Sequence, residues 1–264
     1  MIKLSANLSF LFTQEAFLER FHAASLAGFK GVECLFPYAF PSREIKNRLA
    51  ASRLEMVMFN APPGDWAAGA RGLAALPGRE TDVDAAMEQA LAYATTVHCS
   101  RVHVMAGIVP VGISRTRAMA TLVANLGRAA RVFQPHGINI LIEPINPFDM
   151  PGYLLNRAEE AVEIIERVGA DNVRLQYDIY HARRLGVDPL LEIHRFLPAI
   201  GHIQIAARRG RGEPDDGDPD TPMIFRLLDR LGYDGWVGLE YTPRAGTTAG
   251  LGWAREAGFL SSRG

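Results

Sequence analysis

The chain is poor in cysteine and in long apolar runs, and each shortage excludes a class of protein. Two cysteines in 264 residues, Cys34 and Cys99, give no disulfide framework. No stretch approaches the roughly eighteen uninterrupted apolar residues of a membrane-spanning helix. The N-terminal MIKLSANLSFLF has polar residues inside its apolar stretch and no small-residue cleavage site, so no signal peptide is expected. We therefore expect a cytoplasmic protein.

The chain also lacks net charge and several catalytic motifs. Its 28 basic and 29 acidic residues leave a formal charge of −1, so no overall field favours nucleic acid or a membrane surface as a partner. Only Lys3, Lys30 and Lys46 are lysines, and none lies in the core of a predicted strand, which excludes a Schiff-base aldolase. No GxSxG elbow, P-loop or HExxH motif is present.

Short β-rich runs alternate with longer helical patterns along the chain. The strand candidates are 4–10, 31–37, 54–61, 101–107, 139–146, 173–180, 201–206 and 235–241. The helical patterns lie near 14–27, 42–52, 80–97, 115–134, 157–168, 188–198 and 221–231, with another from about 248. This alternation predicts an α/β fold, a (β/α)8 TIM barrel with residues 1–264 as a single domain. A doubly wound open sheet would alternate in the same way, but the chain has no GxGxxG fingerprint.

Each of the last four predicted strands carries one oxygen-bearing side chain near its C-terminal end: Glu143, Asp178, Gln204 and Glu240. Taken singly, such a residue could equally cap a helix, satisfy a loop amide or pair with an arginine. In a barrel, however, these strand ends converge on one face, and crowded carboxylates repel unless a cation lies between them. Carboxylate and amide oxygens suit Mg²⁺ or Mn²⁺. We therefore predict a divalent metal site.

Two loops supply further candidates for the site. The connection 60–80 is unusually long for a compact domain and carries Trp66 and Arg71, which we interpret as a lid over the barrel mouth, although a packed surface loop is the alternative. The loop 208–218, RRGRGEPDDGD, places arginines where they would suit a carboxylate or phosphate, although a solvated loop would have the same composition.

Motifs spread over nearly the whole chain carry a resemblance to a known family. They are SANLSFLF (5–12), GVECLFPY (31–38), GDWAAGARG (64–72), PGRE (77–80), IEPINPFDMPG (142–152), QYDIYHARR (176–184), HIQIA (202–206), RGEP (211–214), GWVGLEY (235–241) and GLGW (250–253). They resemble the hydroxypyruvate isomerase family, within the xylose-isomerase-like barrels that also include sugar epimerases and endonuclease-IV-type repair enzymes. The chain departs from the family pattern at Ala207, Arg208, Arg209 and Gly210, where a more Asp/Asn/Pro/His-like loop is expected.

The resemblance implies interconversion of hydroxypyruvate and tartronate semialdehyde (2-hydroxy-3-oxopropanoate), assisted by Mg²⁺ or Mn²⁺ and passing through an enediolate. It implies that Glu143 and Glu240 are the acid/base pair and that both bind the metal together with Asp178 and Gln204. The expected substrate contacts are His181, Trp66, Arg71, Arg211 and Glu213. The expected partner is a small hydroxy-keto acid, with no nucleic acid and no membrane, and a homo-oligomer is possible.

Other functions remain open on the same scaffold. One is a 2-oxo-tetronate isomerase, or a related isomerase or epimerase of sugars or sugar acids. A repair endonuclease would need a histidine-rich multi-zinc site and a basic face, whereas the strand ends here offer mainly carboxylates. A non-catalytic binding barrel is disfavoured by the intact acid/base and ligand positions.

Overall fold

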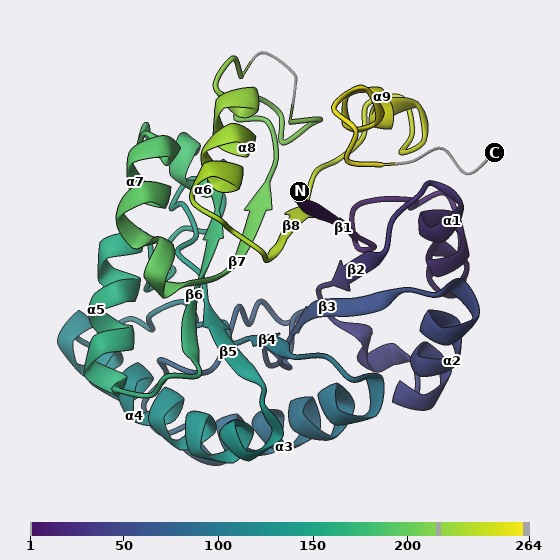
Figure 1. Cartoon of the computed structure of the whole chain (residues 1–264). Coiled ribbons are helices and arrows are strands. Elements are labelled where there is room, and N and C mark those ends of the chain that lie inside the picture. The colour runs from purple at the N-terminus through teal and green to yellow at the C-terminus, as the bar shows by residue number, and fades with distance from the viewer. Residues whose placement is uncertain (1, 215–217, 261–264) are drawn as a thin grey trace. The chain divides into compact units, whose positions relative to one another are not determined.

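The computed structural model describes residues 2–214 and 218–260. Eight strands follow one another in chain order round a closed barrel, and helices connect them (Figure 1). The paired strands run parallel, as in the pairings of β1 (Lys3–Asn7) with β2 (Gly31–Cys34) and with β8 (Trp236–Leu239). This architecture is a TIM barrel and confirms the predicted fold class. The expectation of a single domain over 1–264 stays a prediction.

By their internal contacts, the residues group into two compact units. The first unit comprises 1–57, 178–195 and 202–264. Besides β1, β2 and β8 it holds most of β7 (Ile200–Ile205), with α1 (Arg20–Leu26), α2 (Ser42–Ser52), α6 (Ile179–Arg184), most of α7 (Pro189–Phe196), α8 (Thr221–Arg230) and α9 (Gly252–Glu256). The second unit, 58–177 with 196–201, holds β4 (Arg101–His103), β5 (Asn139–Ile142), most of β3 (Glu55–Asn60) and β6 (Val173–Asp178), with α3 (Glu80–Val97), α4 (Arg115–Phe133) and α5 (Ala158–Val168).

Two glycines beside β1 make room for large side chains inside the first unit. Ser5 lies in register with Gly31 on one side and with Gly238 on the other. A Cβ atom at Gly31 would lie 2.7 Å from the Trp236 ring, and one at Gly238 would lie 2.4 Å from both carboxylate oxygens of Glu33. Such distances are shorter than atoms tolerate, so a larger residue at either position would displace a buried side chain.

Helix α4 supports the strands of the second unit. It packs against α3, α5 and β5, as the outer arc of helices in Figure 1 shows. Its N-terminus is capped by Ser114, whose hydroxyl accepts from the Arg117 amide at 3.2 Å, and Leu122, Leu126 and Phe133 are fully buried along one face. Burial of each such side chain stabilises the fold by about 1.5–3 kcal/mol. The helix therefore supports β5, which ends at Ile142, directly before Glu143.

The predicted elements match in position but not at every boundary. The expected strand 173–180 ends at Asp178, because the Asp178 carboxylate accepts from the Tyr180 amide at 2.8 Å and starts α6 there. Helix α6 itself was not predicted, and the first helix begins at Arg20 after a 3₁₀ turn at Phe17–Glu19 rather than near residue 14.

None of the helices described has both the length and the hydropathy needed to cross a bilayer. The cytoplasmic location stays a prediction.

Candidate active site

Four predicted site residues of the first unit meet at the C-terminal ends of its strands. Asp178 ends β6, Gln204 lies near the end of β7, and Glu240 directly follows β8. A guanidinium nitrogen of Arg211 donates to Glu240 Oε1 and lies 3.5 Å from Asp178 Oδ2. The guanidinium also lies over the rings of Phe10 and Tyr180, 5.0 and 4.7 Å from their centroids. The loop arginine is thus the cation that lies between the two carboxylates.

Glu240 occupies an environment that tunes its proton affinity. Its exposed fraction is only 6%, and its Oε2 accepts from Asn7 Nδ2 at 2.9 Å and from Gln204 Nε2 at 2.7 Å. Burial raises the pKa of Glu240 to about 8; the charge of Arg211 opposes this shift, and the charges of Asp178 and Glu33 add to it. A carboxyl group with such a pKa can both take and return a proton near neutral pH, as an acid/base catalyst must.

Asp178 presents one carboxylate oxygen that lacks a hydrogen-bond donor. Its Oδ1 caps α6, whereas its Oδ2 is buried and accepts no hydrogen bond from the described residues. His181 Nε2 lies 3.6 Å from Oδ2, and a guanidinium nitrogen of Arg211 lies 3.5 Å from it. Because a buried anionic oxygen without a donor is unfavourable, this atom is suited to bind a cation.

Glu143 belongs to the second unit and directly follows β5. It is 6% exposed, and its Oε2 lies 3.7 Å from His103 Nδ1, which in turn is 3.2 Å from Asn60 Oδ1. Burial, and after it the charge of Glu143, raises the pKa of Tyr153 above its ordinary value, so the tyrosine keeps its proton. Glu143 is therefore a buried carboxylate in a polar setting, at the same kind of strand end as Asp178 and Glu240.

Glu143, Asp178 and His181 are all buried and qualify as a group that could hold a metal ion. The sequence had assigned His181 to the substrate and Gln204 and Glu240 to the metal. The group therefore shares Glu143 and Asp178 with the predicted set of four and adds His181. Two carboxylates with an imidazole bind divalent cations, and the Asp178 oxygen without a donor fits that use.

The predicted lid residues contact one another in the loop between β3 and α3. The Arg71 guanidinium lies 3.9 Å from the centre of the Trp66 ring and donates to the carbonyl oxygens of Trp66 and Ala70, at 3.1 and 2.8 Å. Trp66 is 39% exposed. Their contact with substrate stays a prediction.

Glu213 ties two loops together. Its carboxylate accepts from the Arg244 amide at 3.0 Å and from Arg244 Nε at 3.1 Å, which fastens the loop after β8 to the loop after β7. Its predicted role with substrate is not tested by these contacts. In the same predicted arginine loop, Arg208 and Arg209 are exposed, and residues 215–217 lie outside the described residues.

The sequence interpretation missed Glu33 and its partner His202. Glu33 lies on β2 with no exposed surface and accepts from Ser5 Oγ and His202 Nε2, both at 2.8 Å, and from Gln204 Nε2 at 2.7 Å. Burial would raise the pKa of Glu33, but the His202 charge and these hydrogen bonds outweigh it and hold the pKa below its ordinary value. The signal was available: Glu33 interrupts the apolar strand GVEC as Glu143 interrupts ILIEP.

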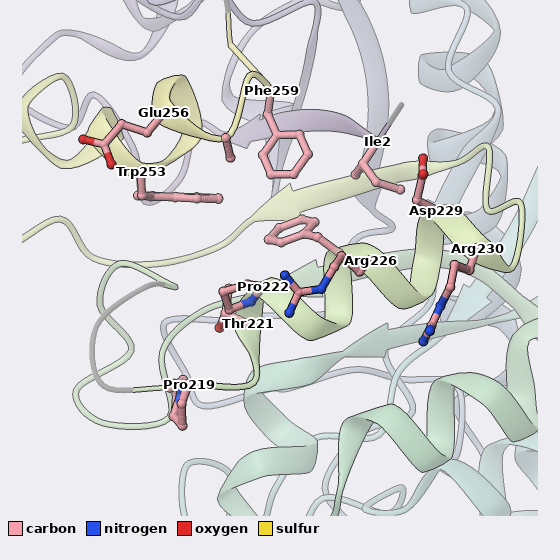
Figure 2. Close-up of a pocket in the computed structure, with 13 residues that line it drawn as sticks. Ile2, Pro219, Thr221, Pro222, Arg226, Asp229, Arg230, Trp253, Glu256 and Phe259 are labelled. Atoms are coloured by element: carbon pink, nitrogen blue, oxygen red, sulfur yellow. The ribbon is translucent and has the colours of Figure 1, made fainter.

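A cavity of about 990 Å³ in the first unit contains none of the predicted site residues (Figure 2). Residues of α8 and α9 and of the segments beside them line it, with Ile2 from the start of the chain. The Phe225 ring lies 5.9 Å from that of Trp253 and 4.7 Å from that of Phe259, centre to centre. Charged side chains of both signs line the cavity beside these three rings, so it differs in chemistry from the carboxylate cluster.

Comparison with protein families identifies the family to which a chain with this geometry belongs. The model of the family described as xylose isomerase-like TIM barrel matches residues 21–261. The chain belongs to this family. Barrel topology and carboxylates at the strand ends agree with that membership.

Relatives within the xylose isomerase-like family indicate the class of enzyme. The chain is 49% identical to the 2-oxo-tetronate isomerase of Cupriavidus necator, over 97% of this chain and 98% of that one. It is 42% identical to the hydroxypyruvate isomerase of Escherichia coli, over 96% and 98%. The crystal structure of an AP endonuclease, family 2, from Brucella melitensis is 43% identical, with a TM-score of 0.96 and coverage of 99% and 100%. The chain is thus an isomerase of the hydroxypyruvate and 2-oxo-tetronate isomerase family, which confirms the resemblance and the enzyme class.

Proposed function

We propose that the protein is a 2-oxo-tetronate isomerase that uses Glu143 and Glu240 as its acid/base pair. The observation that carries the proposal is the pair of buried glutamates directly after β5 and β8, one of them with a pKa raised to about 8. The choice of substrate is supported by the 49% identity to a 2-oxo-tetronate isomerase, compared with 42% to a hydroxypyruvate isomerase. This choice replaces hydroxypyruvate, the first expectation from the sequence.

The proposed reaction moves one proton between neighbouring carbons. A glutamate removes the C–H proton from the hydroxyl-bearing carbon, and the released electron pair forms a double bond to the former carbonyl carbon. Return of a proton to that second carbon, with transfer of the hydroxyl proton between the two oxygens, leaves an isomer with the carbonyl group shifted by one carbon. No external oxidant is needed, because one carbon is oxidised as its neighbour is reduced.

The donor set fits a divalent cation, for which Glu143, Asp178, Gln204, Glu240 and His181 are the candidate ligands. When bound, Mg²⁺ or Mn²⁺ would stabilise the negative charge that develops on the two substrate oxygens. Among the chain's own residues, Arg211 is placed beside Glu240 and Asp178 to bind an anionic group of the substrate. Trp66 would exclude water from the mouth, if the loop closes over it as predicted.

Hydroxypyruvate is the second candidate substrate. It shares with 2-oxo-tetronate a carboxylate, a neighbouring carbonyl and a carbinol carbon, and it lacks only the terminal hydroxymethyl group. The same glutamate pair would serve both reactions, so specificity depends on the pocket around that group. The 42% identity to the Escherichia coli hydroxypyruvate isomerase supports this candidate.

Proton NMR in D₂O tests the proposal directly. The protein is incubated with 2-oxo-tetronate, hydroxypyruvate or a ketohexose, with and without a chelator, and both turnover and solvent deuterium incorporation are followed. We expect kcat/KM for 2-oxo-tetronate to exceed that for hydroxypyruvate at least about tenfold, which corresponds to about 1.4 kcal/mol at the transition state. The reverse preference would support the second candidate. Absence of turnover and of deuterium exchange with both acids would refute the proposed function.

A further inference from the structure

Glu33 is a buried charge that the proposed reaction does not use. It lies on β2 with none of its surface exposed. A carboxylate in such a position is strongly unfavourable unless donors surround it. Its retention inside the barrel therefore calls for an explanation beyond packing.

Four donors from β1 and β7 converge on the Glu33 carboxylate. Ser5 Oγ and His202 Nε2 donate to Oε2, each at 2.8 Å. Gln204 Nε2 donates to Oε1 at 2.7 Å, and Asn7 Nδ2 lies within 3.3 Å of the same oxygen. Strand β8 leaves space for the group, because any Cβ atom at position 238 would lie 2.4 Å from both oxygens. The carboxylate thus occupies a built position rather than an accidental one.

The contact with Gln204 fixes which way its amide points. A carboxylate only accepts hydrogen bonds, so the amide nitrogen of Gln204 must face Glu33. The same nitrogen donates to Glu240 Oε2 at 2.7 Å. Both amide hydrogens are therefore used on carboxylates, and the amide oxygen faces away from them, as a ligand oxygen must.

Asn7 repeats this arrangement on the other side of Glu240. Its nitrogen donates to Glu240 Oε2 at 2.9 Å and contacts Glu33, while its own oxygen accepts from the Ser9 amide at 3.0 Å. Both amides that contact Glu240 thus also contact Glu33.

We propose that Glu33 is a positioning residue, which orients the amide of Gln204 and, with Asn7, the carboxylate of Glu240 for binding a divalent cation. This inference rests on the proposed function, because it takes Gln204 and Glu240 as ligands. The alternative is that Glu33 and His202 form only a buried ion pair that stabilises the barrel. The two possibilities differ in what happens to metal affinity when Glu33 is neutralised.

The experiment compares Mn²⁺ binding to three metal-free proteins: the unaltered protein, Glu33→Gln and Asn172→Ala. Asn172 is the control for lost stability, since its buried amide donates to the carbonyl oxygens of Ala130 and Ile138 in the second unit. Glutamine at position 33 keeps the size of the side chain but can present its own amide hydrogens to Gln204, which removes the constraint. Mn²⁺ affinity is measured by calorimetry or electron paramagnetic resonance, and folding by the thermal midpoint.

We expect Glu33→Gln to bind Mn²⁺ about 10–100-fold more weakly, the effect usual for residues that orient metal ligands. Asn172→Ala should lower the thermal midpoint and leave the Mn²⁺ affinity unchanged. Affinity of Glu33→Gln within twofold of the unaltered protein would overturn the proposal. If Glu33→Gln does not fold, Glu33→Asp, which keeps the charge and shortens the reach, carries the same comparison.

A crystal structure of the metal-free variant separates this inference from the proposed function. Failure of the unaltered protein to bind Mn²⁺ would count against the proposed cation and not against the orientation of Gln204. In Glu33→Gln we expect Gln204 Nε2 to lose its hydrogen bond to Glu240 Oε2. An unchanged contact between Gln204 Nε2 and Glu240 would contradict the positioning role even in the absence of any metal.

Discussion

The two proposed catalytic glutamates differ in their surroundings. Glu240 accepts from two amide nitrogens and from Arg211, and burial raises its pKa to about 8. Glu143 has His103 as a neighbour, at 3.7 Å. Pairs of carboxyl groups in unlike environments are suited to opposite roles, one giving and one taking a proton. We therefore propose Glu240 as the acid of the pair, which leaves the role of base to Glu143.

Replacement of either glutamate by glutamine tests the acid/base pair. Glu143→Gln and Glu240→Gln should each lower kcat about 10²–10⁴-fold, because a positioned acid or base contributes that much. The double variant should lose far less than the product of the single effects, since the two groups act as a unit. Steady-state kinetics with 2-oxo-tetronate provides the measurement. Recovery of Glu240→Gln activity in excess Mg²⁺ or Mn²⁺ would show that Glu240 only binds metal.

Single residues were predictable where a polar side chain interrupts an apolar strand. That signal identified Glu143, Asp178, Gln204 and Glu240 at strand ends. The structure joins Gln204 and Arg211 to Glu240 by hydrogen bonds and places Asp178 Oδ2 3.5 Å from the Arg211 guanidinium. Glu33 carries the same signal but was overlooked, because its partners Ser5 and His202 lie 28 and 169 residues away. Sequence distance conceals such partners.

Helix α6 fixes the loop that carries Arg211. Arg183 is 4% exposed, and its guanidinium donates to Asp220 Oδ1 at 2.8 Å, Thr221 Oγ1 at 2.9 Å and the Ala206 carbonyl oxygen at 3.2 Å. It thereby joins the end of β7 to the start of α8. This element was not predicted, because α6 follows β6 without any turn and the strand pattern continued through it.

Removal of the Arg183 guanidinium should loosen this loop. Arg183→Met should raise the hydrogen-exchange rate of peptides covering 207–214 and 218–221. It should also destabilise the protein by about 1–3 kcal/mol, because the groups that accept hydrogen bonds from the guanidinium lose their donor. Exchange mass spectrometry and chemical unfolding measure the two effects. Arg128→Gln, which breaks a pair with Asp84 on the surface, is the control and should change stability by less than about 1 kcal/mol. Equal exchange rates in both variants would show that Arg183 does not hold this loop in place.

The loop between β3 and α3 supplies a second prediction at this scale. If it closes over the substrate, Trp66→Ala should lower kcat/KM at least about tenfold, with the larger part in KM. Leu191→Ala, which removes another exposed apolar side chain from α7, should leave both constants unchanged. Kinetics of Trp66→Ala indistinguishable from those of Leu191→Ala would mean that the loop is only a packed surface segment.

At the scale of the whole molecule, the fold was predictable because it repeats. The β/α alternation predicted parallel strands covered by helices, and the absence of a GxGxxG fingerprint favoured the closed barrel over an open sheet. The positions of the strands follow from apolar runs that any covered parallel strand needs. Substrate identity was not predictable in this way. Hydroxypyruvate and 2-oxo-tetronate differ by one hydroxymethyl group, and no periodic pattern encodes the side chains that contact it. The possible homo-oligomer likewise stays a prediction, because the β/α pattern does not indicate which surface residues would form an interface.

The cation should stabilise the whole fold as well as enable the reaction. A ligand that binds only the folded state adds about 2.7 kcal/mol at a hundredfold excess over its Kd, and in a chain of this length each kcal/mol raises Tm by about 2–4 °C. Saturating Mg²⁺ or Mn²⁺ should therefore raise the Tm of the chelator-treated protein by about 5–10 °C and restore its isomerase activity. Scanning calorimetry of the protein and of Asp178→Asn measures this, and the variant should show a much smaller shift, since it lacks the carboxylate whose Oδ2 accepts no hydrogen bond from the described residues. Full activity in a chelator together with an unchanged Tm would exclude a bound cation, and the two glutamates would then have to carry the proton transfer with Arg211 as the neighbouring positive charge.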